Sequence, residues 1–137
     1  SPNNKWKRNK IDAENVIKCF INGGCPDDVK VCTYTSNKIK AFKILSNEVT
    51  ITNDSPKTFA FAKNVGELSD SHVTVDKWHL RACQTVSESI KDVKVSVTPK
   101  RYKMIEAETV KVAKEFNLKG YEFQAIVWVT IRNRWVK

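Results

Sequence analysis

The chain has 137 residues, of which 41% are hydrophobic and 28% are charged, and its 24 lysines and arginines against 15 acidic residues give a net charge of +9 at neutral pH. This length suffices for one domain with its own core, and no apolar run approaches the roughly 18 residues that a membrane-spanning helix needs, so we expect no membrane span. The positive charge favours a polyanionic partner such as DNA, because neutralised phosphates release condensed counterions, although a lysine-rich and asparagine-rich chain is also typical of an AT-rich genome.

The first ten residues are basic and lack hydrophobic periodicity, so we expect a loose basic arm over 1–10 and one domain over 11–137. No apolar segment follows the basic residues as it would in a signal peptide. The chain is therefore expected to be intracellular, which for a viral protein means the host cytoplasm. Asp12 is expected to cap the first helix, which ends near Asn22 ahead of two glycines.

Prolines and capping residues predict where the next four helices begin. Pro26 is expected to open a second helix that runs to about residue 34, and Ser36 to cap a third that runs to about residue 45. Pro56, preceded by Asp54 or Ser55 as cap, opens the fourth helix. Asp76 caps the fifth.

The last third of the chain predicts two more helices. Residues 93–97 alternate in polarity like a short strand, and Thr98-Pro99 then opens a long amphipathic helix. The β-branched residues within 121–135 would suit a buried strand, but a single strand would lack a partner, so we expect a buried helix. The predicted fold is therefore mainly α, a compact bundle of about seven helices with 93–97 as one short β segment.

The four cysteines contain no Cys-x-x-Cys pair, and the chain has two histidines. This spacing does not predict a zinc site, so we expect no metal and no cofactor. In an intracellular chain the cysteines are expected to be reduced thiols. The sequence leaves the oligomeric state open.

Two predicted helix starts carry the residues with the clearest chemical meaning. Lys57 follows Pro56 in the first of them, and Asp76 begins the second, nineteen positions later, with Arg81 five residues further on. This arrangement over 51–82 resembles the catalytic segment of helix-hairpin-helix DNA glycosylases, which share the endonuclease III-like fold. The resemblance implies a glycosylase-like helical fold, a DNA substrate with a flipped nucleotide, Lys57 as nucleophile on the sugar and Asp76 as electrostatic partner. The C-terminal cysteine cluster of some relatives is absent.

The chemistry gives a reason for these two positions. An amine attacks only when it is neutral, and the positive end of a helix dipole disfavours a further positive charge on Lys57. N–H groups at a helix start hold a carboxylate such as Asp76 ionised, so it can face a cation that develops on the sugar. The structural alternative is that Lys57 is one of many solvated lysines and that Asp76 is a helix cap and nothing more.

The hairpin departs from the family pattern. Its glycine-containing turn is replaced by 51–56, where Asn53 tolerates a positive φ, Ser55 does so poorly, and Asp54 adds negative charge near the expected phosphate. The chain is also similar to small uncharacterised bacteriophage proteins with a degenerate hairpin. The shared segments are 31–37, those around Lys57 and Asp76, and 123–128.

Other polar and aromatic residues are candidates for contacts with DNA. Trp78 and His79 are expected to form a base pocket or to stack on a base, while Gln124 is expected either to read a base edge or to cap a buried carbonyl. The residues expected to bind the DNA backbone are Asn53, Ser55, Lys63, Lys77, Arg81, Arg101 and Lys103. The predicted function is a DNA-binding protein that resembles a base N-glycosylase/lyase. The alternative is a non-catalytic viral DNA-binding or protein-interaction module.

Overall fold

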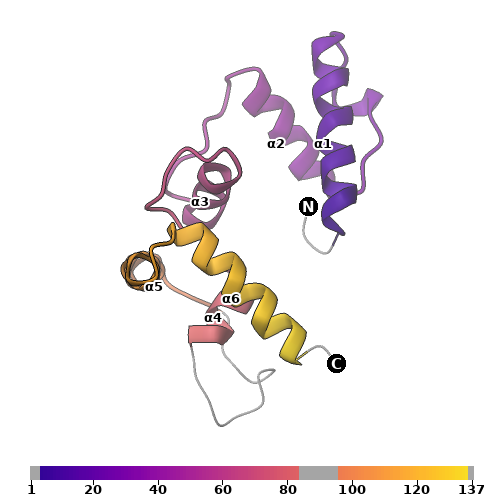
Figure 1. Cartoon of the computed structure of the whole chain (residues 1–137). Helices are drawn as coiled ribbons and strands as arrows, with labels where there is room; N and C mark the ends of the chain where they lie inside the picture. The colour runs from indigo at the N-terminus through magenta and orange to yellow at the C-terminus, as the bar shows by residue number, and fades with distance from the viewer. Residues whose placement is uncertain (1–3, 84–95, 136–137) are drawn as a thin grey trace. The chain divides into compact units, whose positions relative to one another are not determined.

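The computed structural model describes residues 4–83 and 96–135, which contain six α-helices, one turn of 3-10 helix and no strand (Figure 1). The mainly α class predicted from the sequence is confirmed. The chain divides into two compact units, 1–51 and 52–137. The single domain expected over 11–137 stays a prediction. Among the described helices, none combines the length and the apolar composition that crossing a membrane requires.

In the first unit, helix α1 covers Trp6–Ile21, so residues 6–10, expected in a loose arm, are helical. The prediction that Asp12 caps this helix is wrong. Asp12 is buried inside α1, where its carboxylate pairs with the Arg8 Nε at 2.9 Å and accepts a hydrogen bond from the Cys32 N–H at 2.9 Å. A buried carboxylate requires such partners, and here they come from the preceding helical turn and from a distant loop.

The second helix expected after Pro26 is reduced to the 3-10 turn η1, Pro26–Asp28. Val29 has extended backbone angles and is buried, so the turn does not propagate into a helix. Helix α2 then covers Thr35–Leu45. Packing of Val29 between the two helices overrides the local helix signal, and the core of this unit is formed by Val16, Val29 and Phe42.

The second unit contains α3 (Pro56–Val65), α4 (Lys77–Cys83), α5 (Pro99–Glu115) and α6 (Gly120–Trp135). The helix starts predicted at Pro56, after Asp76 and at Pro99 are confirmed. Both α4 and α5 pack against α6 (Figure 1). Of the short strand predicted over 93–97, residues 93–95 lie outside the described residues and 96–97 have no regular secondary structure.

Helix α6 occupies the segment for which a buried helix was expected. Its helical state is confirmed, but its burial is partial, because Ile126 is 54% exposed and Val129 is 48% exposed. The core of the second unit lies elsewhere, where α3, α4 and α5 contribute side chains together with the residues just before α4 and α5. Its buried members are Ala60, Val75, Leu80 and Tyr102, with Val97 and Ile105 packed against them.

Candidate functional site

A hollow of about 300 Å³ opens on the surface of the second unit, beside its hydrophobic core. Lys57 and Asp76, nineteen positions apart in the sequence, both line this hollow. Lys57 comes from the first turn of α3, and Asp76 immediately precedes α4. The remaining lining residues come from the same two helix starts and from the beginning of α5: Ser55, Pro56, Thr58, Val75, Lys77, Leu80, Val97 and Tyr102.

Lys57 stands where Pro56 begins α3, and Ser55 occupies the N-cap without a side-chain hydrogen bond. The first turn of α3 contains no acidic residue, so the positive helix end is not neutralised from within the helix. The Lys57 side chain is exposed to solvent. Any shelter for its amine therefore has to come from a bound ligand.

Residues 51–56 form a turn that needs no glycine. The Ser55 N–H donates to the Thr52 carbonyl at 3.2 Å, and the Thr52 hydroxyl donates to the Asp54 carboxylate at 2.9 Å. Ser55 has a φ of −113°, and Asn53 is not among the residues with positive φ. The backbone conformation for which the family hairpin uses glycine is therefore not adopted here, and Asp54 keeps a carboxylate beside the start of α3.

Asp76 caps α4 with its side chain. One carboxylate oxygen accepts hydrogen bonds from the backbone N–H groups of Trp78, at 3.0 Å, and His79, at 2.8 Å. These are donors that a helix start leaves without intrahelical partners. The Asp76 side chain is half-buried, and one of its oxygens is occupied by the cap. The position of the carboxylate is therefore fixed relative to the hollow.

The three residues before Asp76 have no regular secondary structure, although Val73 and Val75 are buried. The Tyr102 hydroxyl, from α5, donates to the Val73 carbonyl at 2.8 Å and accepts from the Val75 N–H at 3.1 Å. Burial of the phenol raises the pKa of Tyr102 to about 12, and the nearby Glu106 and Asp76 carboxylates act in the same direction. The hydroxyl therefore keeps its proton, and its donor bond, across the neutral pH range.

Two further side chains hold the same segment, which is called the 73–75 segment here. Glu106, one turn after Tyr102 on α5, accepts from the Val73 N–H at 2.9 Å. Gln124, from α6, donates to the half-buried Thr74 carbonyl, and capping of a carbonyl is one of the two roles that the sequence left open for this residue. Side chains thus satisfy the backbone groups that a neighbouring strand would satisfy in a sheet.

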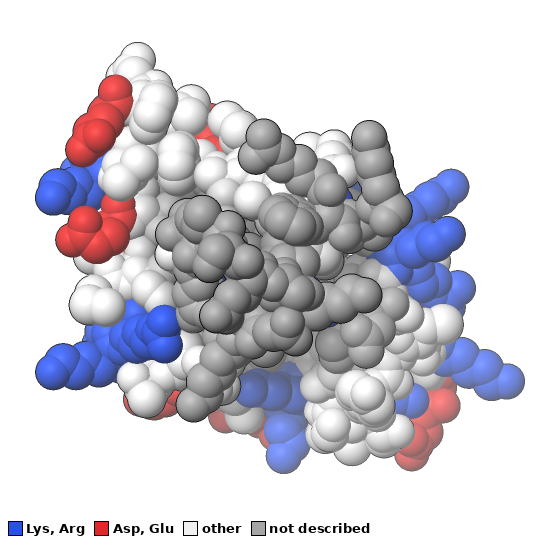
Figure 2. Space-filling view, turned by 90° about the horizontal axis from the view of Figure 1, so that it is seen from below, with Lys and Arg blue, Asp and Glu red and all other residues white. Residues whose placement is uncertain are grey.

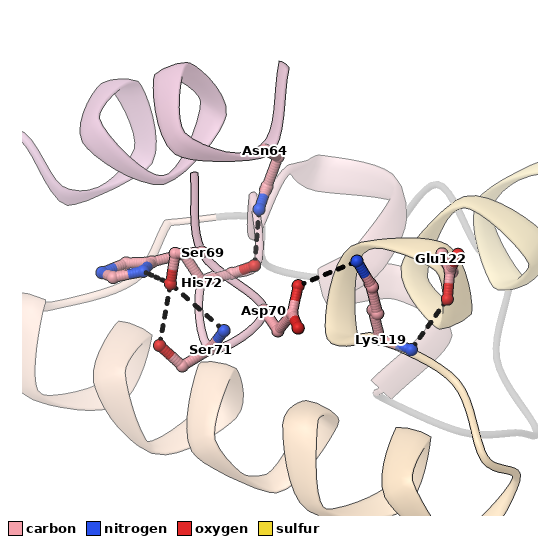
Figure 3. Close-up of polar contacts among 7 residues, drawn as sticks. All are labelled: Asn64, Ser69, Asp70, Ser71, His72, Lys119 and Glu122. Carbon is pink, nitrogen blue, oxygen red and sulfur yellow. Dashed lines mark hydrogen bonds and ion pairs between the residues drawn. The ribbon is translucent and has the colours of Figure 1, made fainter. Parts of the chain in front are cut away.

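The 73–75 segment is also fastened to the helix that carries Lys57. Asn64, in the last turn of α3, donates to the His72 carbonyl at 2.6 Å and accepts from the Thr74 hydroxyl at 2.9 Å. Figure 3 shows Asn64 above the turn that precedes this segment. The Asn64 side chain therefore connects α3, which contains Lys57 in its first turn, with the residues that precede Asp76.

The turn at 69–72 is itself anchored to the start of α6 (Figure 3). The Asp70 carboxylate pairs with the Lys119 ammonium at 3.3 Å, and the Lys119 backbone N–H donates to Glu122 at 2.9 Å. Within the turn, the Ser69 hydroxyl lies 2.7 Å from the His72 Nδ1. These contacts place the entry to the 73–75 segment against α6.

The base-contact residues expected from the sequence lie outside the hollow. His79 is buried, and its Nε2 lies 2.8 Å from the Thr109 hydroxyl, which donates to the Ile105 carbonyl at 2.7 Å. Because the single hydroxyl proton is used there, His79 donates from Nε2. Trp78 is half-buried, with the guanidinium carbon of Arg81 at 5.0 Å from the ring centre. Neither side chain is among the lining residues.

The basic residues expected at a DNA interface are distributed unevenly. Lys77 lines the hollow, and Arg101 lines a second hollow of about 290 Å³ that shares Val97 with the first. Lys103 is exposed, and the Lys63 ammonium lies 5.3 Å from the centre of the Phe59 ring. On the part of the surface that Figure 2 draws for the described residues, acidic side chains are interspersed among lysines and arginines.

Sequence reasoning missed the residues that hold the 73–75 segment. A signal was present, because Tyr102, Glu106, Thr109 and Ala113 recur at helical spacing and share a face of α5. Polar residues on an otherwise buried face indicate hydrogen bonds to buried groups. Within the described residues, no group of three histidine, cysteine or acidic side chains is arranged to hold a metal ion.

The comparisons with known proteins give one positive finding. A family model described as a family of unknown function (DUF7178) matches residues 1–135. Comparison with curated proteins gives no match, and comparison with solved structures gives none either.

Proposed function

We propose that this chain, which belongs to the DUF7178 family, binds DNA and acts on a flipped nucleotide as a base N-glycosylase/lyase. The observation that carries the proposal is that Lys57 and Asp76 line one hollow of about 300 Å³. An amine and a carboxylate in one hollow are the two groups that this chemistry requires from side chains. The proposed fold relationship is to the helix-hairpin-helix glycosylases.

In the proposed reaction the glycosidic bond breaks and its electron pair leaves with the base. Asp76 stabilises the positive charge that develops on the sugar. The amine of Lys57 forms a bond to C1′ and loses a proton. The C1′–O4′ bond then breaks, its electron pair and a proton go to O4′, and a protonated Schiff base with the opened sugar results. Because Lys57 is exposed in the free protein, the bound nucleotide has to displace water from the amine before it reacts.

The cap geometry supports this role for Asp76. Two backbone N–H groups, at 3.0 and 2.8 Å, donate to one oxygen of its carboxylate and fix the position of that negative group. The hydrogen bonds to the 73–75 segment then determine where that charge lies. Lys77 in the same hollow, with Arg101 in the adjoining one, would pair with phosphates on either side of the flipped nucleotide.

A non-catalytic DNA-binding or protein-interaction module is the second candidate. It is favoured by the exposure of Lys57 and by the position of Trp78 and His79 outside the hollow. Under this proposal the +9 chain contacts phosphates, and Asp76 has a capping role alone.

Borohydride trapping separates the two candidates. The full chain is incubated with duplexes that carry damaged or modified bases or an abasic site, and covalent protein–DNA complexes are measured after reduction. The glycosylase/lyase proposal expects trapping by the wild type, loss in Lys57→Ala, and retention in the control Lys111→Ala, which removes an exposed lysine that does not line the hollow. Salt-sensitive binding without trapping or base release overturns the enzymatic proposal and supports the module.

A further inference from the structure

The Tyr102 hydroxyl makes two hydrogen bonds to the main chain just before Asp76. It donates to the Val73 carbonyl at 2.8 Å and accepts from the Val75 N–H at 3.1 Å. Val75 is the neighbour of Asp76 in the chain, so this bond fixes the last peptide before the capping residue. Tyr102 is 3% exposed, and its ring lines the hollow that Lys57 and Asp76 share.

These hydrogen bonds distinguish Tyr102 from an ordinary core residue. Its ring packs with Ala60, Val75 and Leu80 in the core, so the ring contributes to stability in the usual way. Its hydroxyl, by contrast, binds both the Val73 carbonyl and the Val75 N–H, and both groups lie within three residues of Asp76. Removal of the hydroxyl oxygen deletes these two hydrogen bonds near Asp76 but leaves the packed ring in place.

We propose that Tyr102 is a positioning residue that holds the Asp76 carboxylate at the hollow, which it does by binding the 73–75 segment. The proposal rests on the proposed function in so far as it concerns catalysis. Glu106 and Gln124 assist by binding the Val73 N–H and the Thr74 carbonyl. Tyr102 itself transfers no proton in this scheme, because its hydroxyl hydrogen is used by Val73.

The test compares Tyr102→Phe with the wild type and with Tyr34→Phe, which changes a tyrosine of the first unit that is 65% exposed. The first measurement is single-turnover trapping. We expect the single-turnover rate constant to fall about 10- to 100-fold in Tyr102→Phe with little change in the affinity for DNA, since a misplaced group loses rate rather than binding. Equal rate constants in Tyr102→Phe and the wild type overturn a catalytic positioning role.

The second measurement needs no DNA and no activity. Hydrogen exchange of the Trp78 and His79 backbone amides reports the two bonds that Asp76 accepts. We expect exchange of both amides to accelerate about tenfold in Tyr102→Phe, which corresponds to one weakened hydrogen bond, and to stay unchanged in Tyr34→Phe. Unchanged exchange in Tyr102→Phe overturns the proposal, whatever the trapping shows.

The two measurements separate the two proposals. A wild type that traps no DNA overturns the proposed function, and the exchange rates then decide alone whether Tyr102 holds Asp76. Should Tyr102→Phe fail to fold, Gln124→Leu removes the bond to the Thr74 carbonyl from α6. The same acceleration at Trp78 and His79 is expected in that variant, and its absence counts against the proposal.

Discussion

Asp76 and His79 interact in two ways across the first turn of α4. The Asp76 carboxylate accepts a hydrogen bond from the His79 backbone N–H at 2.8 Å. Burial lowers the pKa of the His79 imidazole, and the charge of Asp76 opposes this fall. A residue proposed for chemistry on DNA thus also caps its helix and partly offsets the effect of burial on the pKa of His79.

The capping role of Asp76 and the role of its charge can be tested separately. Asp76→Ala should lower the free energy of unfolding by about 1 kcal/mol, because the Trp78 and His79 N–H groups lose their acceptor. Asp76→Asn should lower the free energy of unfolding by only a few tenths of a kcal/mol, because asparagine caps helices as well as aspartate does. Urea unfolding measures both. If the carboxylate also acts on the sugar, Asp76→Asn loses trapping although it is folded, and a fully active Asp76→Asn contradicts that role.

His79 should make stability depend on pH on the acid side. The unfolded histidine binds a proton below its ordinary pKa of 6.5, whereas burial keeps the folded one neutral to lower pH. The free energy of unfolding should therefore be highest above pH 6.5 and fall as the pH drops towards the lowered pKa. Thermal unfolding between pH 5 and 8 measures this slope.

The variant that tests the origin of that slope is His79→Gln. It should reduce the acid-side slope, since the titrating group is gone. A slope that survives in His79→Gln would assign the acid sensitivity to other groups.

Tyr102 should make stability depend on pH on the alkaline side. Its pKa is raised from 10.0 to about 12 in the folded protein, so the folded state retains a proton that the unfolded state releases. The stabilisation is complete below pH 10 and is lost as the pH rises through about 12. Unfolding of the wild type and Tyr102→Phe at pH 8 to 11 should show a larger loss in the wild type than in the variant.

Gly120, the first residue of α6, permits a close approach to the 73–75 segment. A Cβ at this position would lie 2.9 Å from the Val73 Cγ2 and 2.9 Å from the Val110 Cγ2. Gly120→Ala should therefore lower the free energy of unfolding by about 1–3 kcal/mol through overpacking. Gly66→Ala is the control, because its nearest neighbour is the exposed, movable Leu68 side chain. If Gly120→Ala and Gly66→Ala were equally stable, the close approach of Gly120 to Val73 and Val110 would be contradicted.

Binding to DNA, if it occurs at the hollow, should be sensitive to salt through Lys77. Lys77→Gln is expected to reduce the slope of log K against log [salt] by about 0.9, the contribution of one phosphate contact on duplex DNA. Lys111, whose side chain is 71% exposed on α5 and which does not line the hollow, provides the control Lys111→Gln. Equal slopes for both variants would place the phosphate contacts elsewhere.

Local sequence chemistry predicted the starts of α3, α4 and α5. Pro56, Asp76 and the pair Thr98-Pro99 act within a few residues, so their effect can be recognised without knowledge of the fold. The presence of Lys57 and Asp76 in one hollow needed more than local chemistry, and it was expected because of the family resemblance.

Where the structure differs from the prediction, the cause is a contact with a residue far away in the sequence. Asp12 was predicted as a cap but is held inside α1 by the N–H of Cys32, twenty residues away. His79 was predicted at a base pocket but is buried against Thr109 of α5. The hydrogen bonds of Tyr102 to Val73 and Val75 likewise join residues that no local pattern connects.

The side chains that hold the 73–75 segment come late in the chain. Tyr102, Glu106 and Gln124 lie 27 to 50 positions beyond the backbone groups that they bind. A fragment that ends after α4 would contain both the lysine and the aspartate and yet lack every one of these supports. Under the proposed function, such a peptide should be inert, because these distant contacts, which hold the segment before Asp76 in place, cannot form in it.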